Sequence, residues 1–366
     1  MNISVEKKEF SEAVHIVSRF ADRKNTTLPV LTSILIVAGN EGIKLRATNL
    51  EIGIDLKLTG KVIHEGVVAI PATILQQIAS SFTQEGVVTI EHSGDIVSIK
   101  SGTGKSSIKT IPYDDFPSIP FPENAKNRMV INGAVIKNVF NTVAPCASSS
   151  TVRPELASLY LGIEGGVLTT VATDSFRLVE KKIPLINKGL QGKFLIPAKN
   201  ALDISQALPD EDTIITFDEN QCAFINPRGM IVSRLTNAVY PDYRQIIPKE
   251  SIVEATVLRK DFETTLKRTI IFSDSFQKIK ILFDPKKNIL SFFARNADIG
   301  ESIETIHARL SGNTLEISFN HRYLSTILAL TQTESISFSS AGIGRPLTIK
   351  GVGDTSLLYL VSPMNQ

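Results

Sequence analysis

The sequence has few cysteines and no long apolar run, and each absence excludes a class of protein. Only two of the 366 residues are Cys, and Cys146 and Cys222 show neither the pairing of a disulfide framework nor the spacing of a zinc site. No apolar run reaches the roughly 18 residues that a membrane span requires, and the N-terminus lacks the basic and apolar regions of a signal peptide. We therefore expect a cytoplasmic protein that neither crosses a membrane nor is secreted.

The sequence also lacks the residue patterns of common catalytic and cofactor sites. Its five His residues form no pair at metal-ligand spacing, and no Ser lies in a Gly-x-Ser-x-Gly elbow. Ser101–Ser107 imitates a phosphate-binding loop, but Ile99 stands where that loop needs Gly, so a strand turn fits better. Gly342–Leu347 lacks the final Gly of a dinucleotide loop, and Pro346 opposes a helix there. We expect no catalytic residue, metal or cofactor; a nucleotide hydrolase that uses Gly104–Ser106 is the enzymatic alternative.

A seven-residue segment, by contrast, occurs three times. Ala172–Leu178 resembles Ala47–Gly53, which begins 125 residues earlier (172 − 47), and Ala294–Gly300, which begins 122 residues later (294 − 172). Val68–Ala72 returns as Phe194–Ala198 after 126 residues (194 − 68). A period this long indicates repeated whole domains and not a solenoid of short repeats. Three copies in one chain indicate a body built by rotation, as a closed ring requires.

Composition and two Pro- and Asp-rich segments indicate the boundaries of the repeats. With 42% hydrophobic residues, the chain can bury three ordinary cores. The Pro- and Asp-rich segments Tyr113–Pro120 and Tyr240–Pro248 resemble each other and read as joints. We predict domains at residues 1–122, 128–246 and 250–366.

Each repeat is predicted to contain two helices and antiparallel strands. Apolar residues at helical spacing predict six helices, within 10–20, 74–82, 136–143, 202–208, 262–270 and 323–328. Alternating apolar residues around turns predict hairpins at 87–99, 161–171 and 280–293. The expected fold class is α+β, with two helices on one face of the antiparallel sheets of each domain.

The motifs together resemble one family. The Ala-Thr-Asp-Ser-Phe-Arg-Leu segment, Tyr240–Arg244, the ending Tyr359–Met364 and the threefold repeat are similar to the bacterial DNA polymerase III beta subunit, the sliding clamp family. The resemblance covers essentially the whole chain, with order, spacing and length in agreement. It implies a non-catalytic processivity factor: a head-to-tail homodimer whose six domains form a ring, with helices inside and sheets outside, around double-stranded DNA.

The resemblance also implies which basic residues face the DNA. Lys and Arg side chains along inner helices would keep the duplex centred through contacts that ignore sequence and weaken with salt. Each one could instead belong to an ordinary solvated helix face. The candidates are Lys7, Arg23, Lys24, Lys137, Lys199, Lys267 and Arg322. Of these, Arg23 and Lys24, after the first helix, match the family's DNA-contact region best.

A second implied site is an apolar pocket that binds short peptide motifs of the replicative polymerase, the clamp loader, and repair and accessory polymerases. Its residues by resemblance are Leu156, Thr173, Ser175, Phe176, Arg177, Leu178, Pro241, Ile246, Asn320, Tyr323, Pro346, Leu360, Val361, Ser362, Pro363 and Met364. A flexible Met suits a pocket that repacks around varied side chains. Phe176 and Gln245 depart from the family's usual residues, and the sequence does not tell how this affects peptide preference. Leu156, Leu178 and Val361 could equally be core residues.

The implied dimer contact joins the two ends of the chain. By resemblance, Ile271 and Phe272 meet Ile108 of a second copy, with Ser106 where a larger apolar residue is common. Such a contact is heterologous and must close on itself. The remaining alternative is a repeat-built scaffold that binds protein peptides without encircling DNA.

Overall fold

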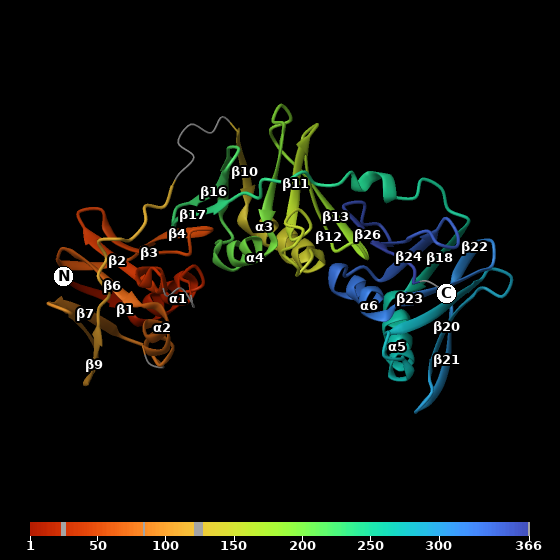
Figure 1. The fold of residues 1–366 in the computed structure, drawn as a ribbon, viewed down its shortest axis with the longest axis horizontal. Helices are drawn as coiled ribbons and strands as arrows, with labels where there is room; N and C mark the ends of the chain where they lie inside the picture. Colours follow the sequence, from red (N-terminus) through yellow and green to blue (C-terminus); the bar gives the residue numbers. More distant parts are fainter. Residues whose placement is uncertain (23–26, 83–84, 121–126, 365–366) are drawn as a thin grey trace. The chain divides into compact units, whose positions relative to one another are not determined.

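The computed structural model describes residues 1–22, 27–82, 85–120 and 127–364. The fold is α+β with antiparallel sheets, as the sequence predicted (Figure 1). The described strands form four such sheets. Two compact units divide the chain: residues 1–140 with 199–237, and residues 141–198 with 238–366. The predicted domain limits at 122, 128, 246 and 250 remain a prediction.

The first unit contains two sheets, both antiparallel. One has the strand order β5 (Gly60–His64), β1 (Asn2–Glu6), β7 (Val87–Ser93), β8 (Ile96–Ser101) and β9 (Gly104–Lys109). The other has the order β10 (Asn127–Asn132), β15 (Asp212–Phe217), β16 (Gln221–Asn226), β17 (Gly229–Arg234), β4 (Ile52–Leu58), β3 (Gly42–Thr48), β2 (Ser33–Gly39) and β6 (Gly66–Pro71). In this second sheet, strands of the first and second repeats pair directly, β4 with β17.

The second unit has the same design. Its larger sheet has the order β14 (Gly192–Pro197), β11 (Ser158–Glu164), β12 (Val167–Thr173), β13 (Arg177–Pro184), β26 (Leu357–Val361), β25 (Leu347–Gly351), β24 (Ser335–Ser340), β18 (Val253–Leu258) and β22 (Arg309–Gly312). The smaller has the order β21 (Gly300–His307), β20 (Ile289–Asn296), β19 (Lys278–Asp284) and β23 (Leu315–Asn320). Here β13 of the second repeat pairs with β26 of the third.

The six predicted helices are confirmed. They are α1 (Lys7–Val17), α2 (Ala72–Ser80), α3 (Gly133–Val143), α4 (Ala198–Ala207), α5 (Arg259–Thr269) and α6 (His321–Leu330), with short 3₁₀ turns η1 (Pro29–Thr32), η2 (Ala144–Cys146), η3 (Tyr243–Ile246) and η4 (Ile270–Phe272). In α1 the stripe Phe10, Ala13, Val14 and Val17 is buried, as its spacing requires. The helix ends before Phe20, which is nevertheless fully buried.

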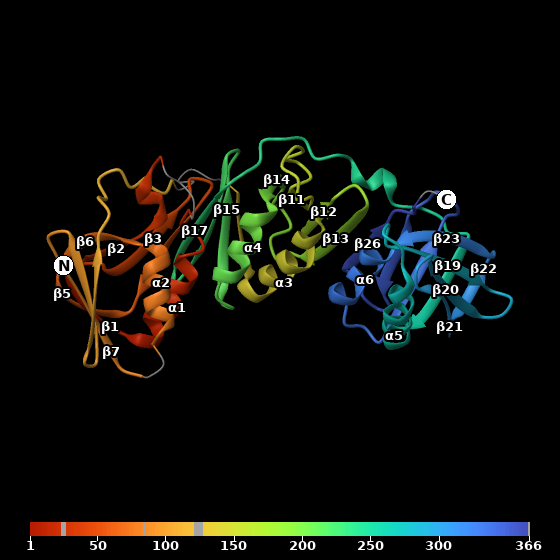
Figure 2. The same ribbon diagram turned by 60° about the horizontal axis from the view of Figure 1, so that its bottom comes forward.

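Helices pair on one face of the sheets. In the first unit α1 packs against α2 and against β3 and β4, and in the second α5 packs against α6, β20 and β21 (Figure 2). In β19 the inward residues Ile279, Ile281 and Phe283 are buried and alternate with Lys278 and Lys280. That period of two gives the small sheet an apolar face toward α5 and a polar face away from it.

The predicted hairpins are also confirmed, at β7–β8, β11–β12 and β19–β20. The loop that imitates a phosphate site is the turn between β8 and β9, where Ser101 pairs with Gly104. Gly102 takes φ +59°, a left-handed conformation that suits Gly. In the described part of the chain no helix starts after this turn until α3, so the helix N-terminus of a phosphate loop is missing.

Candidate peptide and nucleic-acid interfaces

The repeated Ala-Thr-Asp segment forms a tight turn between β12 and β13. Asp174 Oδ1 accepts hydrogen bonds from the backbone N–H groups of Phe176 (3.0 Å) and Arg177 (2.9 Å). Thr173 Oγ1 donates to the Arg177 carbonyl at 2.7 Å and accepts from the Ser175 N–H at 3.2 Å. The side chains thus hold Ser175 at φ +77°, which an L-residue adopts only at a cost. The turn projects Phe176 outward, with 57% of its surface exposed.

Arg177 ties this turn to two other elements. Its Nε donates to Asp174 Oδ2 (2.9 Å), its Nη1 to Thr326 Oγ1 on α6 (2.9 Å) and its Nη2 to the Pro145 carbonyl in η2 (2.7 Å). Only 19% of the Arg177 side chain is exposed. A planar guanidinium suits this three-way connection because its donors lie in a fixed fork. Arg177 therefore holds the β12–β13 turn against α6 and η2 through these hydrogen bonds.

Two aromatic rings form the exposed part of the candidate pocket. The Phe176 and Tyr323 rings stack with centroids 5.9 Å apart and planes 13° apart. The Arg177 guanidinium lies 5.2 Å from the Tyr323 ring centroid, a favourable cation–π geometry. Tyr359, which the sequence analysis did not single out as a pocket residue, donates from its hydroxyl to the Tyr323 carbonyl at 2.7 Å. Burial of Tyr359 raises the pKa of its phenol, so it remains a donor at neutral pH.

The C-terminal segment runs beside these rings. The Ser362 N–H donates to the Phe176 carbonyl and the Met364 N–H to the Ser318 carbonyl, both at 2.8 Å. Ser362, Pro363 and Met364 are half-buried. Residues 362–364 are thereby held between the turn and β23, and Met364 is placed by its backbone hydrogen bond while the residue stays partly accessible.

The remaining predicted pocket residues divide by burial. Fully or nearly buried are Leu156, Thr173, Leu178, Leu360 and Val361. Half-buried or exposed are Ser175, Pro241, Ile246, Asn320 and Pro346. Leu178 and Leu360 are cross-strand partners and pack with Val171 and Tyr243, so both are core residues as well as neighbours of the turn. Asn320 caps α6 by accepting the Arg322 N–H at 2.9 Å. No hydrogen bond joins Pro241, Ile246 or Pro346 to Phe176 or Tyr323 among the described residues.

The predicted DNA-contact residues are distributed over the helices. Lys7 begins α1, Lys199 and Arg322 are the second residues of α4 and α6, and Lys137 and Lys267 lie within α3 and α5. Lys137 pairs with Asp210 (2.6 Å) and Lys267 with Glu263 (2.7 Å). Arg23 and Lys24 lie outside the described residues.

The predicted dimer residues lie at a strand edge and beside one. Ile108 belongs to β9, the last strand of its sheet, and is 6% exposed. Ile271 is 64% exposed and Phe272 half-buried in η4, which packs against β20 and β21. The two groups occur in different units, which the structure describes separately.

Other site types receive no support from the described residues. Among them no group of three His, Cys, Asp or Glu side chains could hold a metal ion. No described helix is long and apolar enough to cross a membrane.

Comparison with known proteins decides the family. Three family models match consecutive parts of the chain: the N-terminal domain of the DNA polymerase III beta subunit at residues 1–120, its central domain at 130–242 and its C-terminal domain at 244–365. The chain belongs to the DNA polymerase III beta subunit family. It is accordingly a non-catalytic DNA polymerase processivity factor of the sliding clamp type.

Relatives agree over the full length. A beta sliding clamp of Synechococcus elongatus is 26% identical, over 100% of this chain and 99% of its own. A beta sliding clamp of Bacillus subtilis is 25% identical over 100% and 99%. Among solved structures, the Bacillus subtilis sliding clamp superimposes with a TM-score of 0.93 at 25% identity, covering 100% and 99%. The Thermotoga maritima beta subunit superimposes with a TM-score of 0.94 at 21% identity, covering 100% and 99%.

Proposed function

We propose that two copies of this chain close head to tail into a ring around double-stranded DNA and tether the replicative polymerase, the clamp loader, and repair and accessory polymerases through short peptides. The domains would be residues 1–122, 128–246 and 250–366. The protein would act in the cytoplasm, where both of its buried cysteines stay free thiols.

The observation that carries the proposal is one strand junction, made twice in the chain. After the turn in the segment Ala47–Gly53, β4 pairs with β17, and Ile54 lies opposite Ile231. After the turn in the segment Ala172–Leu178, β13 pairs with β26, and Val179 lies opposite Tyr359. Each junction has one further backbone hydrogen bond of 2.8 Å at its end. At the β4–β17 junction the Arg234 N–H donates to the Glu51 carbonyl. The Ser362 to Phe176 bond is its counterpart.

The chain leaves the third such junction open at both ends. In the described residues, β21 follows the turn in the third segment, Ala294–Gly300, and lies at the edge of its sheet. Strand β9 occupies the position in the first repeat that β17 occupies in the second, and it also lies at a sheet edge. Unpaired strand edges tend to pair with another chain. Two edges that differ from each other support head-to-tail closure by a second copy.

The repeat also gives the register of the missing junction. Ser302 lies opposite Ala294 in the β20–β21 ladder, as Val179 lies opposite Ala172. Ile231, moved back by the 125-residue period, is Ser106 (231 − 125). Ser106 of one copy is therefore expected opposite Ser302 of the other, and antiparallel pairing then sets Ile108 opposite Gly300.

Two features favour that register. A Cβ atom at Gly300 would lie 3.8 Å from Phe272 Cε1. Because Ile108 of the second copy would lie opposite Gly300, its side chain would be next to Phe272, which is the contact that the family resemblance implies. Lys105 and Lys109 on β9 would face a strand that carries Glu301 and Glu304. Opposite charges across a ladder stabilise pairing.

The DNA role rests on enclosure more than on adhesion. The proposed DNA-facing side chains are Lys7, Arg23, Lys24, Lys137, Lys199, Lys267 and Arg322. Because Lys137 and Lys267 already have carboxylate partners, the attraction of these helices to phosphate is moderate. Moderate contacts suit a protein that must slide.

The peptide role is assigned to the Phe176–Tyr323 pair with Met364 beside it, completed by Leu156, Thr173, Ser175, Arg177, Leu178, Pro241, Ile246, Asn320, Pro346, Leu360, Val361, Ser362 and Pro363. An aromatic surface beside a flexible Met suits a peptide with Leu or Phe side chains. Removal of residues 364–366 is expected to weaken peptide binding and leave the dimer intact; unchanged affinity would argue against this pocket.

The decisive experiment tests topological retention. Fluorescently labelled protein is mixed with linear duplex DNA, the ends are ligated, and the circles are separated at high salt, which removes protein held only by charge. We expect protein to stay on circles and to leave when a restriction enzyme cuts them. Equal retention on cut and closed DNA, or none on either, would reject encirclement and leave the scaffold hypothesis.

A further inference from the structure

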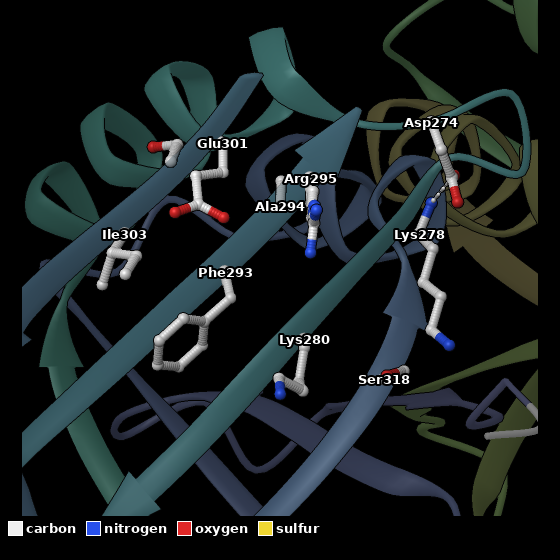
Figure 3. A pocket seen from close by; sticks show the side chains of 10 residues that line it. Asp274, Lys278, Lys280, Phe293, Ala294, Arg295, Glu301, Ile303 and Ser318 are labelled. Carbon is white, nitrogen blue, oxygen red and sulfur yellow. Dashed lines mark hydrogen bonds between the residues drawn. The ribbon is translucent and has the colours of Figure 1, made fainter. Parts of the chain in front are cut away.

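The outward face of the four-stranded sheet carries a cavity to which the ring proposal assigns no ligand, and β21, which lines it, is the edge proposed to pair with β9 of a second copy. The cavity lies over β19, β20, β21 and the end of β23, on the side away from α5, with a volume of about 360 Å³. Figure 3 shows Phe293 between Ile303 and Lys280, one residue from each of three adjacent strands. The volume is at the small end of the range for ligand pockets and suits a short segment, not a folded domain.

Two cations of this cavity, Lys278 and Arg295, lack an ion-pair partner among the described residues. Lys280 pairs with Glu316 at 3.1 Å and its Nζ lies 5.3 Å from the Phe293 ring centroid. Like charges on neighbouring strands repel each other, and a bound anion that pairs with both Lys278 and Arg295 would relieve that repulsion.

The lining also holds two carboxylates, Asp274 and Glu301, and neither forms an ion pair with Lys278 or Arg295 in the described structure. Asp274 Oδ1 is engaged by the Lys278 backbone N–H at 3.0 Å (Figure 3). Glu301 is the cross-strand partner of Arg295, yet no ion pair within 4.0 Å forms between them in the described structure. Glu301 lies on the β21 edge, where the register proposed above brings Lys105 and Lys109 of a second copy diagonally next to it. In the ring, the basic β9 would therefore neutralise Glu301 and leave Lys278 and Arg295 to a ligand.

Apolar surface lies beside the cations. Ile303 is 64% exposed and Phe293 is half-buried next to it. A polyanion such as nucleic acid uses only the charge and leaves this apolar surface uncovered. A peptide with an aliphatic side chain between carboxylates uses both features.

We propose that this cavity binds an acidic peptide segment, with its carboxylates on Lys278 and Arg295 and an aliphatic side chain against Phe293 and Ile303. The residues that bind the peptide all belong to one chain. Only the neutralisation of Glu301 by Lys105 of a second copy rests on the proposed dimer. Neither Phe176 nor Tyr323 lines this cavity, so it provides a second contact for a partner already held by its peptide motif.

The test uses the full-length protein and the synthetic peptide acetyl-Asp-Glu-Ile-Glu-Asp-amide. Isoleucine methyl groups are labelled for NMR, and we expect the Ile303 methyl signal to move on titration while that of Ile246 stays fixed. The double variant Lys278→Ala with Arg295→Ala is expected to bind about tenfold more weakly. Removal of two uncompensated like charges does not endanger folding, which circular dichroism checks.

A matched control removes two lysines from the same hairpin. Lys286→Ala with Lys287→Ala changes the turn between β19 and β20 and should leave the affinity unchanged. Equal weakening in both double variants, or a peptide that moves Ile246 and not Ile303, would overturn the site. An oligothymidylate that moves Ile303 at lower concentration than the peptide would overturn the choice of ligand.

The share of the second copy is measured separately. The dimer-interface variant Ile271→Ala with Phe272→Ala should bind the acidic peptide severalfold more weakly, and unchanged affinity would refute the role of Lys105. Retention on circular DNA is scored in its own assay, so failure of the ring and failure of the cavity give different results.

Discussion

At the scale of single residues, Arg177 is the connection on which the candidate peptide site depends. Its three hydrogen bonds reach the β12–β13 turn, α6 and η2, and its guanidinium faces Tyr323. The sequence placed Arg177 in the pocket by resemblance. The contacts give it a positioning role there, because three of its five N–H donors are already used within the fold.

We expect Arg177→Lys to lower the free energy of unfolding by roughly 2 kcal/mol, since one ammonium cannot replace three directed donors in a mostly buried position. Arg244→Lys is the control, because Arg244 is 64% exposed and its ion pair spans 3.9 Å; its effect should stay within about 0.5 kcal/mol. Denaturant unfolding measures both. Equal effects would show that the Arg177 connections add no stability.

His321 couples stability to pH. Burial, and to a lesser extent Arg322, lowers the pKa of this histidine below its ordinary 6.5, and its Nε2 lies 2.7 Å from Gln277 Oε1. The unfolded chain therefore takes up the proton first as the pH falls. The stabilisation is fully present above about 6.5 and is lost as the pH falls from there toward the lower folded-state pKa.

We expect the melting temperature of the wild-type protein to fall between pH 7.5 and 5 more steeply than that of His321→Gln, as measured by calorimetry. Parallel profiles for the two proteins would show that His321 does not carry this pH dependence.

At the scale of elements, strand edges decide how repeats join. β4–β17 and β13–β26 are built on the same turn and the same register. Because side chains alternate along a strand, a slip of one residue would turn every inward side chain outward. The open edges β9 and β21 should obey the same rule.

We expect chains carrying Ser107→Cys and Glu301→Cys to form an intermolecular disulfide on mild oxidation, since the proposed register places these residues opposite each other on one face. Non-reducing electrophoresis detects it. The pair Ser107→Cys with Ser302→Cys is the control, with side chains on opposite faces. Native Cys146 and Cys222 are buried, and burial raises the pKa of the Cys146 thiol to about 12, so neither should interfere. Stronger cross-linking of the control would refute the register.

At the scale of the whole molecule, the proposed function depends on closure of the ring. Each chain of 40.0 kDa supplies two complete junctions and half of a third at either end. A ring needs the halves of separate copies to meet, and tight adhesion to DNA then becomes unnecessary.

We expect Ile271→Ala with Phe272→Ala to shift the solution mass from about 80 kDa (2 × 40.0) toward 40.0 kDa and to abolish retention on circular DNA. Burial of these side chains against Ile108 would be lost, at about 2 kcal/mol for each large apolar side chain. Ile186→Ala, at a side chain 95% exposed, is the control and should leave mass and retention unchanged. Light scattering gives the mass. A double variant that stays dimeric would show that the interface lies elsewhere.

Features that depend on interactions between residues close together in the sequence could be predicted from it, and features that depend on distant residues could not. The six helices and the hairpins could be predicted because apolar spacing and turn residues act within a few positions. The left-handed backbone of Leu50 (φ 73°) and Ser175 (φ 77°) could not, since neither residue favours it and the Asx and Thr hydrogen bonds impose it. The candidate pocket came from resemblance, and its division into buried Leu178 and exposed Phe176 required the packing.

The sequence by itself determined the threefold repeat, the elements within each copy and the family, because periodicity and motif order are properties of the chain. Tertiary structure decided which strands meet at the junctions and which edges stay free. It also decided that Arg177 is held by three partners while Lys278 and Arg295 have no ion pair among the described residues. These outcomes join residues as far apart as Arg177 and Thr326, and contacts of that range depend on packing geometry that no local pattern encodes.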